Sequence, residues 1–328
     1  MTKGAGPGYE GLQRKKLLTL LITLALVLTA ALVEAGTGSI KFGLDEIFLA
    51  LTGRGSATAN TVLFGIRFPR AVAAILVGAA LAMSGAVMQC VLHNPLASAS
   101  TLGVSQGAAF GAAVGIIVFG GGVVNTGAAD FAIRIDDPYI VTLCAFVFGS
   151  LSTVVVIAIS RLRRDIGPGG LVLAGVALSS LFSGGSTLLQ YFADEQKLGA
   201  VVFWTFGDLG GTYWKDIAMM LAVVLAAFVY FYFNRWNYNA IQSGEETAKG
   251  LGVNTDALLL VGMLVCAFTA AMIVSNVGLI NFVGLIAPHM VRKFVGSDYR
   301  FLIPCSALMG AVLMLCADVV SRAVIPPT

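Results

Sequence analysis

Charged residues are scarce in this sequence: Asp, Glu, Lys and Arg together make up 11% of its 328 residues, whereas 58% are hydrophobic. The mean hydropathy is +0.90. A single soluble core cannot bury this many apolar side chains, so the composition excludes an ordinary soluble domain and indicates a membrane protein. The net charge of only +3, without basic clusters interleaved with aromatic residues, gives no support for nucleic-acid binding.

The usual patterns of catalytic and nucleotide-binding sites are also missing. No G-x-x-x-x-G-K-[ST] loop occurs, so we expect the chain itself to bind no ATP. The two histidines, His93 and His289, have no carboxylate at a metal-ligand spacing, and the five cysteines stand singly in apolar runs. No nucleophile with a paired base can be proposed. The sequence therefore predicts no resident metal or cofactor and favours a protein that is not an enzyme.

Long apolar runs are what the sequence does contain, and none has the period-two alternation of a membrane strand. A helix needs about 20 residues to cross the hydrocarbon, and it satisfies its own backbone groups there. We therefore predict an all-α polytopic membrane protein. Its nine expected spans are residues 17–35, 69–91, 101–120, 139–160, 170–192, 213–233, 256–275, 278–292 and 302–320.

The N-terminal segment, residues 1–16, is expected to be a cytoplasmic tail, followed by one transmembrane domain over residues 17–328. The tail is Gly-rich up to Gly11, which predicts flexibility, and Arg14, Lys15 and Lys16 precede the first apolar run. That run is longer than the core of a typical signal peptide, so we expect it to remain as the first span. The positive-inside rule then places the N-terminus in the cytoplasm.

A weak similarity between two segments of the sequence favours transport over a purely structural role. Ser84–Ser98 and Ser275–Met290 each run from small residues into a Pro-containing break, and repeats are common in transporters. Ionisable residues in the spans are few, since only Glu34 and Asp318 lie near predicted span ends. An ion-driven carrier usually needs more of them. A membrane scaffold without transport is a further alternative.

A polar island, "NAIQSGEETAKGLGVN" (Asn239–Asn254), separates two apolar runs. Ser243 and Glu246 have the S-x-x-E spacing of a capping box. Lys249 suits a helix C-terminus, and Gly250 or Gly252 can supply a left-handed stop. We predict a short capped helix in a cytoplasmic loop, for which a simple solvated connector is the alternative interpretation.

Several ordered segments resemble the FecCD-type permeases, the membrane subunits of ABC importers for ferric siderophores, haem and cobalamin. The resembling segments are Arg67–Ala108, Leu171–Leu178, Gly244–Asn254, "FVGLIAPHMVR" (Phe282–Arg292) and "ADVVSR" (Ala317–Arg322). The resemblance implies a type II importer permease with ten helices. It also implies a second permease subunit, identical or paralogous, two cytoplasmic ATPase subunits that bind ATP and Mg, and an extracytoplasmic substrate-binding protein.

Site residues follow from the same resemblance. Arg67, Arg70 and Arg322 would dock the binding protein, although snorkelling cations at helix ends are the simpler reading. Asn94, Pro95 and Leu96 would form a cytoplasmic gate, or only a turn. Ser179, Ser183, Ser186 and Thr187 would line the pathway, or bond between helices. The expected ATPase coupling helix comprises Ser243, Gly244, Glu245, Glu246, Ala248, Lys249, Leu251 and Gly252.

Two departures from the family pattern affect these expectations. The family commonly has an acidic residue and proline after "NPLA", where this chain has Ser98, Ala99 and Ser100. The sequence also stops at "AVIPPT", where the family continues into a tenth helix, so that helix is either truncated or absent.

The function expected from the resemblance is import of an iron(III)-siderophore across the bacterial cytoplasmic (inner) membrane by ATP-driven alternating access. Haem or cobalamin is the near alternative. An ion-coupled secondary carrier is the alternative from another class, and it predicts transport without ATPase subunits.

Overall fold

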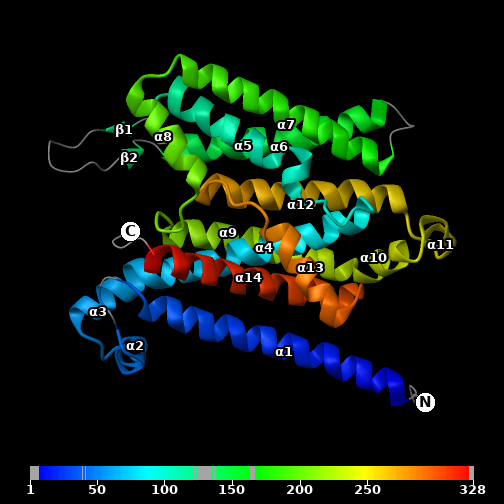
Figure 1. The fold of residues 1–328 in the computed structure, drawn as a ribbon, viewed down its shortest axis with the longest axis horizontal. Helices are drawn as coiled ribbons and strands as arrows, with labels where there is room; N and C mark the ends of the chain where they lie inside the picture. The colour runs from blue at the N-terminus through cyan, green and yellow to red at the C-terminus, as the bar shows by residue number, and fades with distance from the viewer. Residues whose placement is uncertain are drawn as a thin grey trace. The chain divides into compact units, whose positions relative to one another are not determined.

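A computed structural model describes residues 7–38, 40, 42–121, 123–124, 134–135, 138–162 and 167–324. Most of these residues are helical (Figure 1). The α-helices are α1 Pro7–Gly36, α2 Leu44–Leu51, α3 Ala57–Val62, α4 Phe68–Val91, α5 Val104–Ala113, α6 Pro138–Leu162, α7 Pro168–Tyr191, α8 Glu195–Phe206, α9 Trp214–Phe233, α10 Arg235–Gln242, α11 Glu245–Gly250, α12 Thr255–Val277, α13 Val283–Val295 and α14 Tyr299–Val324. The remaining elements are the π-helices η1 Leu63–Arg67 and η3 Val114–Val118, the 3-10 helix η2 Ala99–Leu102, and the antiparallel strands β1 Val123–Val124 and β2 Arg134–Ile135.

Among the described residues, seven helices are long and apolar enough to cross a membrane. They are Glu10–Gly36, Ala57–Val91, Tyr139–Leu162, Pro168–Tyr191, Trp214–Phe233, Thr255–Val277 and Tyr299–Ala323. Each corresponds to one of the spans expected from the sequence, which confirms the all-α membrane architecture. The first helix, α1, already begins at Pro7, inside the segment expected as an N-terminal tail, and the assignment of that tail stays a prediction.

The two other expected spans are shorter helices, so the count of nine is not confirmed. Residues 101–120 contain the apolar helix Val104–Val118, which is preceded by the 3-10 turn η2. In the expected span 278–292, helix begins only at Val283, and α13 is 13 residues long. Gly278, with φ of +78°, ends α12, and a non-glycine residue would be strained there. Apolar composition alone could not reveal this break.

The chain forms two compact units. The first unit comprises residues 1–86, 212–244 and 283–328, and the second comprises residues 87–211 and 245–282. In the first unit α14 packs against α1, α13, α9 and α10. In the second unit α6 packs against α5, α7 and α12. The polar island of the sequence is thus divided between the two units after Gly244.

Glycines allow very close helix packing inside the first unit. A Cβ atom on Gly78 of α4 would overlap the backbone at Gly310 of α14, and one on Gly85 would overlap the backbone at Gly284 of α13. Both glycines belong to the small-residue segment "VGAALAMSGAVM". Close approach of this kind favours helix association in lipid, where no hydrophobic drive exists between helices.

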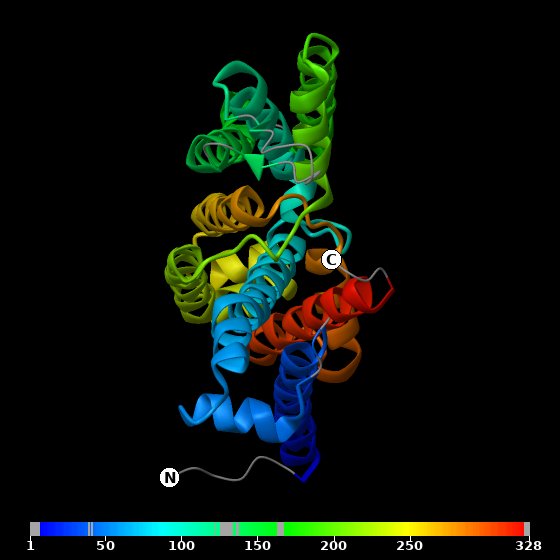
Figure 2. The same cartoon turned by 90° about the vertical axis from the view of Figure 1, so that its left-hand side faces the viewer.

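A small cluster closes one end of the first unit. Helices α2 and α3 pack beside the C-terminal part of α1 (Figure 2), where Ala35, Ile47 and Leu63 are buried together. Ser56 caps α3 by accepting a hydrogen bond from the backbone N–H of Ala59. The cluster fixes the chain segment that leads into η1 and Arg67.

Candidate functional site

The three arginines expected to dock a binding protein lie at one end of the first unit, but they are not free surface cations. Arg67 is 5% exposed. Its guanidinium donates hydrogen bonds to the carbonyl oxygens of Ala35 and Ile40 and lies 4.7 Å from the ring centre of Phe42. These contacts tie η1 to the C-terminal end of α1 and to the segment that follows it, which is a structural role.

Arg70 and Arg322 are held in a buried network with two carboxylates. Arg70 Nε lies 3.0 Å from both carboxylate oxygens of Asp318. Arg322 lies 2.6 Å from Glu34 Oε1 and 3.0 Å from Asp318 Oδ2, and it donates to the carbonyl of Thr37 at 3.0 Å. Glu34 is fully buried. The network joins α1, α4 and α14, and the docking role of its arginines stays a prediction.

A second polar cluster lies near the other end of α1, around Asp298 in the turn before α14. Lys16 Nζ donates to Asp298 at 2.9 Å, Arg300 Nη2 donates at 2.7 Å, and Asn239 Nδ2 donates at 3.2 Å. Burial alone would raise the pKa of Asp298, but the hydrogen bonds from Arg300, Lys16 and Asn239 outweigh it and hold the pKa well below its usual value.

The spacing of the two clusters fits a bilayer. Lys16 and Glu34, one in each cluster, are 18 residues apart on the same helix, which corresponds to about 27 Å of rise at 1.5 Å per residue. A bilayer has about 30 Å of hydrocarbon. The two charged clusters therefore stand where the ends of a spanning helix meet the polar regions of a membrane.

The polar island folds as two helices, and the predicted capping box is wrong. Ser243 is the C-cap of α10, and its hydroxyl lies 3.5 Å from the carbonyl oxygen of Asn239, to which it donates. Gly244, with φ of +112°, separates it from α11, which begins at Glu245. The S-x-x-E spacing misled the prediction because the serine closes the preceding helix. Tyr238 and Ile241 of α10 are buried in the first unit.

The short helix α11, in the second unit, has six residues and a defined stop at its C-terminal end. Lys249 Nζ lies 3.0 Å from Glu245 and 3.5 Å from Glu246. The hydrogen bond from Lys249 lowers the pKa of Glu245 below its usual value. The backbone N–H of Gly252 donates to the carbonyl oxygen of Lys249 at 2.9 Å, and the N–H of Val253 donates to the carbonyl oxygen of Ala248 at 3.0 Å. Together these two bonds form a Schellman motif.

Gly252 has φ of +83°, so the predicted left-handed stop is confirmed at this residue, whereas Gly250 lies inside α11. Ala248 is fully buried, and Leu251 is 70% exposed. The helix thus turns one small residue inward and presents an apolar side chain at its C-terminal end. Asn254 follows as the N-cap of α12 and accepts a hydrogen bond from Ala257 at 3.0 Å.

The expected gate residues form a turn in the second unit. Helix α4 ends at Val91, and the side chain of Asn94 accepts a hydrogen bond from the N–H of Leu96 at 2.9 Å, across Pro95. His93 has φ of +48°, which is uncommon for a residue other than glycine. The Leu96 side chain is 67% exposed. The helix break that the proline predicted is present, and the gating role stays a prediction.

The four polar residues expected to line a pathway lie on α7. Ser179, Ser186 and Thr187 each donate to the carbonyl four residues earlier in the same helix. Ser186 is buried and Ser179 half-buried, whereas Ser183 and Thr187 are exposed. Bonding within α7 accounts for three of the hydroxyl groups, and the pathway-lining role of this face stays a prediction.

Sequence reasoning missed the partners that hold these sites. Glu34 and Asp318 were expected only as charges near span ends, and Asp298 was not singled out at all. Their arginine and lysine partners are 288, 248 and 282 residues away in the chain. No local pattern signals such a pair. Among the described residues, no group of three His, Cys, Asp or Glu side chains could hold a metal ion.

Comparison with known proteins shows close relatives. A Methanocaldococcus jannaschii protein assigned as an ABC transporter permease, MJ0087, is 47% identical over 97% of this chain and 90% of its own length. The iron(3+)-hydroxamate import system permease protein FhuB of Bacillus subtilis is 33% identical over 94% of this chain and 77% of its own. Relatives at 31% and 34% identity are permease proteins of a hemin transport system from Yersinia pestis and a cobalamin import system from Halobacterium salinarum.

A solved structure shares the fold. It is an inward-facing conformation of an ABC transporter assigned to the metal-chelate type, with a TM-score of 0.81 and 30% identity over 93% of this chain and 91% of its own. The model of the FecCD transport family matches residues 20–328. The chain is therefore a multi-pass ABC importer permease that belongs to the FecCD transport family.

Proposed function

We propose that this chain is the permease subunit of a binding-protein-dependent importer that carries an iron(III)-siderophore across the cytoplasmic membrane by alternating access. The observation that carries the proposal is the family match over residues 20–328, together with the likeness to an iron(3+)-hydroxamate permease along 94% of the chain. ATP would be hydrolysed by partner ATPase subunits. The near alternatives are haem and cobalamin, which are named for other relatives in the family.

Helix α11 is the proposed contact with the ATPase. A helix that transmits a conformational change between subunits must be rigid. The Schellman motif and the ion pairs of Lys249 with Glu245 and Glu246 favour a rigid helix. Leu251, exposed at the end of the helix, suits an apolar pocket in a partner. Burying an exposed leucine side chain of this kind contributes about 1.5–3 kcal/mol.

The proposed orientation places α11 and the N-terminus in the cytoplasm. Lys16, Lys249 and Arg300 would then lie on the cytoplasmic side, which agrees with the positive-inside rule. The network of Glu34, Arg70, Asp318 and Arg322 would face the binding protein. A second permease subunit would complete the pathway.

Reconstitution would test the assignment to an ABC importer. The chain would be placed in proteoliposomes with its partner ATPase and binding protein, and uptake of iron-55 as a ferric hydroxamate would be measured with and without ATP. We expect uptake only with ATP. Uptake driven by an ion gradient without the ATPase would instead support a secondary carrier.

The coupling role has its own variant and a matched control. Glu245→Lys breaks the pair with Lys249 and reverses the charge at the start of α11. We expect uptake to fall about tenfold while ATP hydrolysis continues, since the loss of an interface contact that contributes about 1.4 kcal/mol weakens binding about tenfold. Glu195→Lys makes the same change in the first turn of α8 and should leave both activities normal. Equal effects of the two variants would refute the coupling role.

A further inference from the structure

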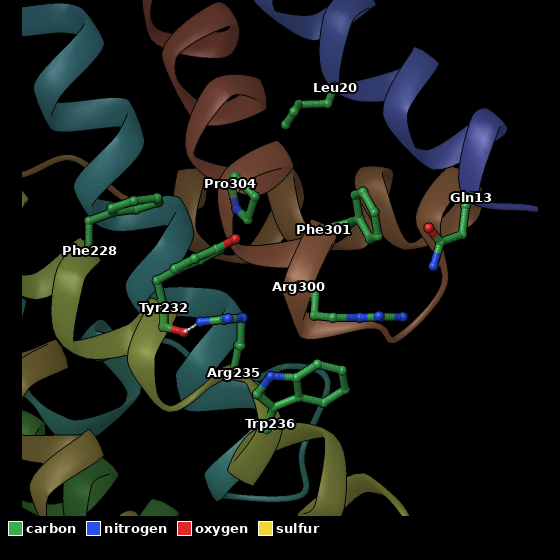
Figure 3. A pocket seen from close by; sticks show the side chains of 9 residues that line it. All are labelled: Gln13, Leu20, Phe228, Tyr232, Arg235, Trp236, Arg300, Phe301 and Pro304. Atoms are coloured by element: carbon green, nitrogen blue, oxygen red, sulfur yellow. Dashed lines mark hydrogen bonds between the residues drawn. The ribbon is translucent and has the colours of Figure 1, made fainter. Parts of the chain in front are cut away.

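A surface pocket of about 390 Å³ lies in the first unit, near the Asp298 cluster. Helices α1, α9, α10 and α14 form its walls (Figure 3). Its lining residues are Gln13, Leu20, Phe228, Tyr232, Arg235, Trp236, Arg300, Phe301 and Pro304. The lining thus contains two arginines and four aromatic rings.

The polar end of the pocket carries a net positive charge. Arg235 donates to the backbone carbonyl of Tyr232 at 2.6 Å, and its guanidinium lies 4.1 Å from the centre of the Tyr232 ring. Within the part of the chain that the structure describes, no carboxylate pairs with Arg235. The guanidinium of Arg300 lies 4.9 Å from the ring of Trp236, and its Nη2 pairs with Asp298 at 2.7 Å.

The other end of the pocket is apolar and lies along the spanning helices. Leu20 is one helical turn beyond Lys16 on α1, Phe228 is one turn before Tyr232 on α9, and Pro304 is one turn beyond Arg300 on α14. On each of the three helices the side chains therefore change from polar to apolar toward this end of the pocket. Trp236 is 56% exposed beside the arginines. Tryptophan and tyrosine favour the headgroup level of a membrane, where one part of the ring is wet.

We propose that this pocket binds an anionic phospholipid. The phosphate group lies on Arg235, whose fork of N–H donors matches phosphate oxygens. The acyl chains lie against Leu20, Phe228 and Pro304. A phospholipid fits better than a soluble phosphate compound because the apolar wall continues along helices that span the membrane. Basic pockets between membrane helices on the cytoplasmic side bind anionic headgroups in the same way.

Native mass spectrometry of the full chain, released from nanodiscs with equal amounts of phosphatidylglycerol and phosphatidylcholine, tests the site. We expect one retained phosphatidylglycerol in the unaltered protein. Arg235→Gln should lower its retention about tenfold, the value expected for the loss of a hydrogen bond between charged groups. Arg235→Lys keeps the charge and should retain an intermediate amount. Lys293→Gln removes an exposed charge of α13 outside the pocket and is the matched control.

Three outcomes would overturn the proposal: equal losses with Arg235→Gln and Lys293→Gln, equal retention of the two lipids, or displacement of the lipid by millimolar inorganic phosphate. Circular dichroism of each variant establishes that it is folded, and Arg235→Lys serves as the folded comparison if Arg235→Gln is not. The measurement needs no ATPase, binding protein or substrate, so it stays informative if the proposed transport function is wrong.

Discussion

Replacing Asp298 by asparagine should destabilise the first unit, because this carboxylate joins three segments of the chain. It accepts hydrogen bonds from Lys16 on α1, from Arg300 at the start of α14 and from Asn239 on α10. The side chain of Asp298 is 13% exposed. The asparagine side chain would keep the size and one acceptor oxygen but lose the negative charge.

The magnitude follows from these contacts. A hydrogen bond to a charged group contributes about 1.5–3 kcal/mol when it is shielded from water. The side chains of Lys16 and Arg300 are 19% and 27% exposed, which weakens both pairs through solvent screening. Because the network is shared and its members do not add, we expect Asp298→Asn to lower the free energy of unfolding by about 2–3 kcal/mol at pH 7.

The stabilisation should depend on pH in a defined direction. Since the folded state depresses the pKa of Asp298, the carboxylate stabilises fully above the unfolded pKa of about 4, and this contribution is lost as pH falls through the lower folded pKa. Unfolding by SDS in mixed micelles, followed by circular dichroism, measures the free-energy difference at pH 7 and at pH 3. The gap between the two proteins should be smaller at pH 3.

Asp256→Asn is the control for this experiment. Asp256 is an exposed residue in the first turn of α12, where its loss should cost about 0.5 kcal/mol through the helix dipole. If Asp298→Asn costs no more than this control, or if the gap does not change with pH, the three-way network around Asp298 contributes nothing measurable and the reasoning is refuted.

Two further predictions concern packing and buried charge. Gly78→Ala should lower the free energy of unfolding by about 2 kcal/mol or more in the same SDS titration, because its Cβ would overlap a facing backbone. The control is Gly184→Ala, where no atom lies within 4 Å of the added Cβ, and it should be neutral or stabilising. Equal effects of the two variants would count against the close approach at Gly78. Asp318→Asn should cost about 3 kcal/mol, because it leaves the buried charges of Arg70 and Arg322 without their shared carboxylate; an unchanged titration curve would show that the network contributes little to stability.

The helices of this protein could be predicted from sequence because lipid imposes one requirement on every span, a long apolar run. Seven expected spans are helices of sufficient length. The region around Gly278 could not be predicted in the same way, because its composition is apolar on both sides of a backbone break. A hydropathy pattern reports which solvent a segment prefers, and it does not report whether the backbone stays helical through it.

Of the helix ends in the polar island, the stop at Gly252 could be predicted from the sequence and the role of Ser243 could not. Gly252 could be predicted as a stop, since few other residues adopt its positive φ. Ser243 could not be assigned, because a serine hydroxyl can accept at the start of one helix or donate at the end of another. Which bond forms depends on where the preceding helix α10 ends, and α10 is held by Asn239, which contacts Asp298 59 residues away.

The arginines at the other end of the first unit show that the role predicted for a residue changes once its partners in the structure are known. On sequence alone, Arg70 and Arg322 are cations at helix ends, available to acidic groups of a docking protein. In the structure Asp318 already forms an ion pair with Arg70, and Glu34 already forms one with Arg322. An incoming glutamate would have to compete with carboxylates that are held in place and shielded from salt, whereas it would itself lose hydration on arrival. Docking through these arginines therefore requires either a rearrangement of the Asp318 pairs or acidic groups that share the arginines' remaining N–H donors.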